Sequence, residues 1–229
     1  MTQRHELRWG GFAGLGFLVL AVLAALLPGV PPRVTATQDS IASYVADGRS
    51  QMLLAALLYA TAAGLLIWFG AAFAEAIRER EERSDVHLAL LAGVVLIGAA
   101  LFMYGAALGV LAYGAGLRDL ATTVGLFQGL MVLNALLGFA AALPLTAAGI
   151  GVLRTHLMPD WLGYVGLAAA AVSVLAGFSI FVDSGIYAPG GSLMPFVSLT
   201  AGGIFVAVAS GYMVREHLPE AAPMTLSQT

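Results

Sequence analysis

The chain has 229 residues, of which 60% are hydrophobic and only 10% are charged, whereas a soluble domain carries about 25% charged residues. Its small net charge of -3 gives no reason to expect a nucleic-acid partner. The chain has no cysteine, and all ten of its basic residues are arginines, which excludes disulfides, thiolate and iron-sulfur chemistry and Schiff-base lysines. The composition is that of a chain surrounded by lipid.

Six apolar runs are each long enough to cross a membrane, because a helix needs about 20 apolar residues to span about 30 Å of hydrocarbon. The expected spans are residues 10–28, 52–74, 88–113, 123–153, 162–183 and 194–214. With short loops they account for nearly the whole chain. We therefore predict an all-α fold, in which residues 1–229 form a single integral membrane bundle of six transmembrane helices.

The first apolar run also resembles a secretory signal peptide, because a short head with Arg4 and Arg8 precedes it. The apolar region of a signal peptide usually has about 7–15 residues, whereas this run extends over residues 10–27. Residues 34–36 form the one passable cleavage site. We expect a retained first helix, with removal of residues 1–36 as the alternative.

The arginines predict the orientation of the chain, because loops on the cytoplasmic side carry an excess of Arg and Lys. With a cytoplasmic N-terminus, seven arginines lie on the cytoplasmic side and three lie outside. The three outside are Arg33, Arg49 and Arg118. We therefore expect a multi-pass protein of the cell membrane with both termini in the cytoplasm.

The loop after the first span predicts a short amphipathic helix over residues 35–48. Thr35 and Gln38 have the spacing of a capping box, and apolar side chains recur at helical intervals from Ile41 to Val45. We expect this helix to lie on the outer membrane face. Its apolar stripe either rests on lipid or on the ends of the bundle, or covers an outward-facing cavity.

The fourth span, residues 123–153, is too long for one straight crossing, since it would measure about 46 Å at about 1.5 Å per residue, against about 30 Å of hydrocarbon. We expect it to tilt, bend or protrude. Pro144 is the expected kink, because proline lacks the N–H of a helical hydrogen bond. Thr146 or a neighbouring helix should answer the carbonyl groups that Pro144 frees.

Two amides, Gln128 and Asn134, lie within the same apolar run. A polar group in lipid is poorly satisfied without a partner, so both should face the bundle, as contacts between helices or as ligand contacts. Their separation of six residues rotates them by about 240°. Both cannot point the same way from one straight helix.

Asp183, near the outer end of the fifth span, is the carboxylate most closely flanked by apolar helix. It is either a solvated helix-end residue that bonds Ser184 or Tyr187, or a partly desolvated acid that donates a proton or holds a cation. The candidate ligand-binding residues are thus Gln128, Asn134, Asp183 and Tyr187. We assign no catalytic residue, unless the protein is an enzyme, in which case it is Asp183.

The histidines do not indicate a metal site. His87, His156 and His217 fall at helix ends near the cytoplasmic boundary, and none has the spacing of a metal-ligand motif. We expect no metal and no cofactor.

Small and aromatic residues predict how the helices pack. Gly105 with Gly109, and Gly125 with Gly129, have the spacing that lets two membrane helices approach closely. We expect tight internal packing first and a homodimer through these faces second. The tyrosines and tryptophans fall largely near helix ends, which is typical of interfacial belts, with an aromatic pocket as the alternative.

Two segments carry a resemblance to a known family. One comprises residues 39–49, which lead into the second span, and the other comprises Arg154 and residues 158–163, which open the fifth. They resemble a bacterial family of uncharacterised six-helix membrane proteins grouped under a "domain of unknown function" label. The resemblance covers nearly the whole chain and implies architecture only.

Three functions fit these observations. The first is a non-enzymatic protein that binds or transports a small apolar or amphipathic molecule through an outward-facing cavity. The second is a structural or partner-binding membrane subunit, which predicts a solid bundle. The third is a membrane-embedded enzyme acting on a lipid-like or isoprenoid substrate, for instance an acid-initiated cyclase with Asp183 as proton donor, which needs an enclosed aromatic pocket.

Overall fold

A computed structural model describes residues 2–81, 83–182, 185, 187–188 and 194–215. The described part is helical and contains no strand, which confirms the all-α prediction. Its elements are α1 (Thr2–Leu26), α2 (Gln38–Asp47), α3 (Arg49–Arg78), α4 (Val86–Tyr113), α5 (Leu120–Thr155), α6 (Asp160–Gly177), a 3-10 turn η1 (Phe178–Phe181) and α7 (Met194–Arg215).

Five helical stretches in the described residues are long and apolar enough to cross a membrane. They are Leu7–Leu26, Arg49–Arg78, Val86–Tyr113, Leu120–Thr155 and Asp160–Phe181. The fifth begins as α6 and ends as the 3-10 turn η1, so its α-helical part is shorter than predicted. Large apolar side chains such as Val19, Leu57 and Phe102 are exposed on the outside of the bundle, where lipid would cover them.

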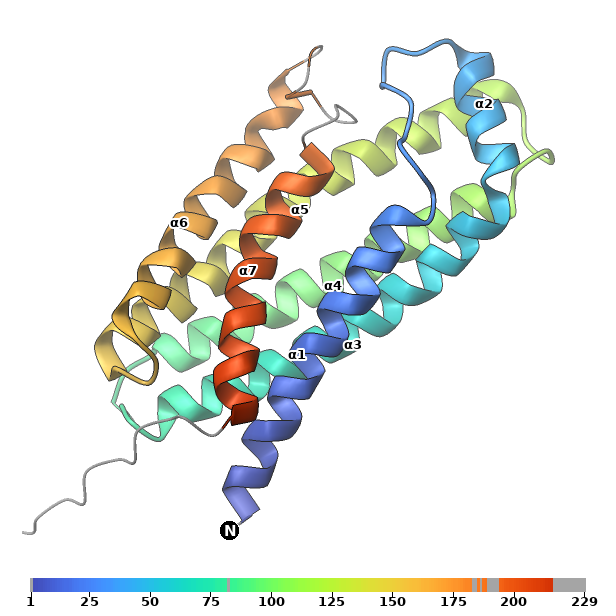
Figure 1. The fold of residues 1–229 in the computed structure, drawn as a ribbon. Helices are drawn as coiled ribbons and strands as arrows, with labels where there is room; N and C mark the ends of the chain where they lie inside the picture. The colour runs from blue at the N-terminus through green and yellow to red at the C-terminus, as the bar shows by residue number, and fades with distance from the viewer. Residues whose placement is uncertain (1, 82, 183–184, 186, 189–193, 216–229) are drawn as a thin grey trace, which may run out of the picture.

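The long helices close into a ring. Neighbours pack in the order α1, α3, α4, α5, α6 and α7, and α7 returns to α1. Figure 1 shows α2 lying at one end of this bundle, while the start of α1 and the end of α7 lie at the other. We call these the α2 end and the opposite end. The six long helices follow one another around the ring in chain order, and α2 is not part of the ring.

Close approach between neighbouring helices depends on glycine at a few positions. A methyl group placed on Gly93 of α4 would lie 2.7 Å from the backbone nitrogen of Pro144 in α5. One placed on Gly105 would lie 3.0 Å from the backbone oxygen of Ala56 in α3. Distances this short leave no room for a side chain, so these glycines set the spacing of α4 from both of its neighbours.

The two predicted small-residue pairs behave differently. Gly105 lies against α3, as does Gly109 at van der Waals distance, which confirms internal packing for this pair. Gly125 and Gly129 are exposed and have no neighbouring atom within 4 Å of an added methyl group. The prediction of internal packing is wrong for this second pair, because α5 turns the neighbouring Phe127 inward and these glycines outward.

Helix α2 begins two residues later than the predicted capping box. Its N-cap is Thr37 rather than Thr35, and the Thr37 hydroxyl oxygen accepts a hydrogen bond from the backbone N–H of Ser40 at 3.4 Å. Ile41 and Val45 are fully buried, and α2 packs against α5 and α4. The apolar stripe therefore rests on the end of the bundle and not on lipid.

Helix α5 runs without interruption through Pro144 for 36 residues, or about 54 Å. The carbonyl that a proline at this position frees belongs to Ala140, four residues earlier. The hydroxyl of Thr146 instead donates to the backbone oxygen of Ala142 at 2.8 Å. Thr146 therefore does not bond the freed carbonyl, so the first of the two predicted partners is wrong, and a partner on a neighbouring helix stays a prediction.

Candidate functional site

The ring of helices encloses a cavity of about 220 Å³ along its length. Side chains of α1, α3, α4, α5 and α7 line it, together with Tyr44 of α2. Almost all of the described lining residues are aliphatic or aromatic, and none of them is charged. The apolar part of such a lining accepts apolar molecules, whereas its few polar side chains can bind polar groups.

The cavity is long. Its lining on α3 extends from Met52 to Phe73, and its lining on α5 extends from Phe127 to Ala148. On each helix this is a rise of about 32 Å, close to the hydrocarbon thickness of about 30 Å. On α4 the lining covers the same rise, from Leu90 to Leu111.

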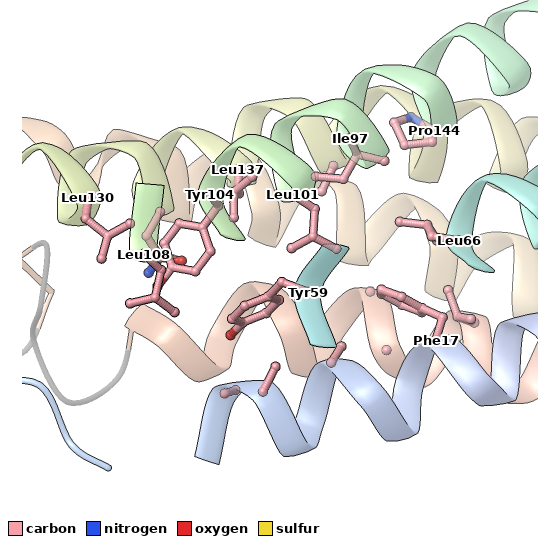
Figure 2. A pocket seen from close by; sticks show the side chains of 18 of the residues that line it. Phe17, Tyr59, Leu66, Ile97, Leu101, Tyr104, Leu108, Leu130, Leu137 and Pro144 are labelled. Atoms are coloured by element: carbon pink, nitrogen blue, oxygen red, sulfur yellow. The ribbon is translucent and has the colours of Figure 1, made fainter. Parts of the chain in front are cut away.

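The polar side chains that three of these helices contribute lie at one depth. Tyr59 of α3, Tyr104 of α4 and Asn134 of α5 each lie seven residues, or about 10 Å, from the lining residue nearest the α2 end. We call these three residues the polar level. The rings of Tyr59 and Tyr104 meet edge to face, with their centres 5.2 Å apart, and Figure 2 shows both projecting from their helices into the pocket.

The contacts between helices place the polar level independently of helix rise. Gly105 packs beside Tyr59, which puts Tyr104 and Tyr59 at the same depth. Gly93 packs against Pro144, and α4 and α5 run in opposite directions. Tyr104 lies eleven residues after Gly93, and Asn134 lies ten residues before Pro144. These two side chains therefore lie at nearly the same depth in the bundle.

The polar groups of the polar level can form further hydrogen bonds. Neither the hydroxyl groups of Tyr59 and Tyr104 nor the amide of Asn134 has a hydrogen-bond partner in the part of the chain that the structure describes. Buried tyrosine hydroxyls usually find a partner, and an unpartnered polar group in apolar surroundings costs about 1–3 kcal/mol. A bound molecule that fills these bonds would recover that free energy.

Helix α2 covers the cavity at the α2 end of the bundle. The ring of Tyr44 lines the cavity and lies edge to face against Phe127, with the ring centres 6.1 Å apart. Burial raises the pKa of Tyr44 to about 12, so its hydroxyl stays uncharged at neutral pH. The loop before α2 adds Pro28, Gly29 and Pro31 to the same end of the lining.

The three predicted ligand-binding residues that the structure describes, Gln128, Asn134 and Tyr187, do not come together. Asn134 lines the cavity, whereas Gln128 is exposed, so the prediction that both face the bundle is wrong for Gln128. Their rotation around α5 allows only one of them to point inward. Tyr187 is absent from the described lining, and its hydroxyl donates to the backbone oxygen of Leu175. Asp183 lies outside the described residues.

The tyrosines of the cavity were predicted to belong to interfacial belts. Trp68, Tyr113 and Tyr164 are indeed exposed on the outside, whereas Tyr59 and Tyr104 line the cavity. The signal in the sequence was their position, since Tyr59 lies seven residues and Tyr104 nine residues inside the ends of their predicted spans. Belt residues lie at the membrane surface, so such depth favours an internal role.

Ionic contacts lie at the opposite end of the bundle. Arg154 of α5 forms an ion pair with Glu81 at 3.1 Å and approaches the hydroxyl of Ser84 at 3.4 Å. The His156 ring nitrogen lies 2.8 Å from the Asp160 carboxylate. The contacts of Arg154 join the loop after α3 to α5, and the His156–Asp160 contact lies within the connection between α5 and α6.

The remaining histidines have separate positions. The Nδ1 atom of His87 lies 2.7 Å from the backbone oxygen of Ser84, and His217 lies outside the described residues. Within the described part of the chain, no group of three or more metal-ligating side chains comes together.

No protein-family model, curated protein or solved structure matches this chain.

Proposed function

We propose that this chain is an integral membrane protein with six transmembrane helices, α7 being the sixth, and that it shares the architecture of the bacterial six-helix family that it resembles. The return of α7 to α1 supports this proposal, because it completes the ring. The start of α1 and the end of α7 lie at the same end of the bundle (Figure 1). The arginine distribution makes that end cytoplasmic and the α2 end external.

We further propose that the protein binds a small apolar or amphipathic molecule in its cavity and acts as a carrier for this molecule. The observation that supports this function best is a cavity of about 220 Å³ whose described lining has no charged side chain. In a bilayer the ligand is already out of water, so close packing against this lining and hydrogen bonds to its polar groups favour binding. A structural subunit would be expected to fill this space with side chains, as protein interiors normally do.

Extraction of bound molecules tests this function. Protein purified in detergent is washed, denatured in organic solvent, and the released molecules are identified and counted by mass spectrometry. The variant Ala141→Phe places a ring into the apolar lining. Its matched control, Ala106→Phe, adds the same ring on the exposed face of α4.

The expected result is a defined amphipathic molecule at close to one copy per chain in the wild type and in Ala106→Phe. Its occupancy should fall at least fivefold in Ala141→Phe. Equal recovery from all three proteins, or only the bulk lipid composition, would show that the cavity is not the binding site.

A further inference from the structure

The cavity is polar at one depth and apolar beyond it, and this arrangement identifies a class of ligand. We infer that the ligand is an uncharged, elongated amphipath whose single hydroxyl or carbonyl head bonds Tyr59, Tyr104 and Asn134, and whose apolar chain extends toward the opposite end. This inference rests on the proposed binding function. It adds the polarity, the charge and the direction of the bound molecule.

The direction follows from the distribution of polar side chains. From the polar level to the opposite end, the lining of α3, α4 and α5 continues for 14 residues, or about 21 Å. No described side chain along this part is polar, and Leu66, Phe73, Ile97 and Phe205 are typical of it. This length accommodates a chain longer than one hydrocarbon leaflet, which is about 15 Å deep.

The absence of charge on the ligand follows from the described lining. Burying an ionised head away from water is costly unless an opposite charge or several hydrogen bonds compensate for it. No described lining residue carries a charge at neutral pH, and the charged side chains of Arg154 and Glu81 lie at the opposite end. A neutral hydroxyl head can instead both donate to and accept from the tyrosine hydroxyls and the asparagine amide.

Three probes of equal chain length test this class of ligand. Binding of 1-hexadecanol, hexadecane and hexadecanoate is measured through the rise in the thermal unfolding midpoint of the purified protein at neutral pH, since a ligand that binds the folded state stabilises it. The variant Tyr59→Phe/Tyr104→Phe removes two hydroxyls while keeping both rings. Tyr164→Phe, on a side chain that is 65% exposed, is the matched control.

In the wild type and in Tyr164→Phe, hexadecanol should bind about tenfold more tightly than hexadecane, as expected for one or two net hydrogen bonds, and hexadecanoate should bind most weakly. The double variant should bind the alcohol and the alkane within about twofold of each other. Equal binding of alcohol and alkane by the wild type, or preference for the carboxylate, would overturn the inference while leaving the binding function intact. Failure of all three probes would overturn the binding function itself.

Photo-cross-linking tests the direction. A hexadecanol with a diazirine on its terminal carbon should label residues 66–73, 90–97 and 141–148, where the apolar part of the lining lies. The same alcohol with the diazirine beside the hydroxyl should label residues 52–59, 104–111 and 127–134. An exchange of these two patterns, or the same pattern from both probes, would overturn the inferred orientation.

Discussion

The apolar part of the cavity and its polar level differ in their effect on the stability of the folded protein. Toward the opposite end, the described lining residues are apolar and carry no side-chain polar group that needs a partner. At the polar level, Tyr59, Tyr104 and Asn134 hold hydrogen-bonding groups that no other described residue satisfies. Side chains that oppose stability in the empty protein are expected where binding requires them. The contrast therefore separates residues that build the cavity from residues that select its contents.

The largest loss of stability is expected when the helix spacing that keeps the cavity walls in place is disturbed. Gly93→Ala adds a methyl group against the backbone of Pro144 and should destabilise the protein by about 1–3 kcal/mol through overpacking. The thermal unfolding midpoint in detergent, followed by tryptophan fluorescence, measures the effect. Gly129→Ala is the matched control, because nothing lies near that glycine.

The control should be neutral or stabilising by up to about 1 kcal/mol, as expected for glycine replaced in a helix. Equal destabilisation by both variants would mean that the spacing of α4 and α5 does not depend on Gly93.

The polar level itself can be tested through a gain in stability. Asn134→Leu replaces an unpartnered amide in the cavity by an apolar group, and should stabilise the ligand-free protein by about 1 kcal/mol. The same variant should weaken hexadecanol binding. Thermal unfolding with and without the alcohol measures both effects.

Gln128→Leu provides the comparison on the same helix, since Gln128 is exposed. It should leave hexadecanol binding unchanged, because the side chain of Gln128 lies outside the cavity. A loss of stability in Asn134→Leu would show that the amide has a structural partner.

The helix that covers the α2 end of the cavity gives the most local expected effect. Thr37→Ala removes the N-cap of α2 and should cost about 1 kcal/mol of local stability. Hydrogen exchange of the amides of residues 38–47 should become faster, whereas Thr35→Ala should leave it unchanged. Similar exchange in both variants would contradict the assignment of Thr37 as the cap.

The sequence predicted the helices well because apolar runs are local. Residues 52–74 and 88–113 were expected to be spans, and they lie within α3 (Arg49–Arg78) and α4 (Val86–Tyr113). The α-helical end of the fifth span was not predictable, because a 3-10 turn replaces the last α-helical turns from Phe178 to Phe181. Hydropathy does not distinguish these two kinds of helix.

The site was predictable only in part, because it depends on which helices become neighbours. Residue spacing showed that Gln128 and Asn134 cannot face the same way, but it could not show which of them points inward. Tyr59 and Tyr104 meet only because α3 and α4 pack side by side through Gly105. The contact between α1 and α7 is a property of the closed ring, and no local pattern encodes it.

A density map of the purified protein in lipid nanodiscs tests the central claim most directly. The account predicts elongated density that begins beside Tyr104 and Asn134 and continues toward Phe73 and Ala148, with one end within hydrogen-bonding distance of the tyrosine hydroxyl. A cavity filled by side chains, or density whose charged head lies at the opposite end beside Arg154, would contradict it.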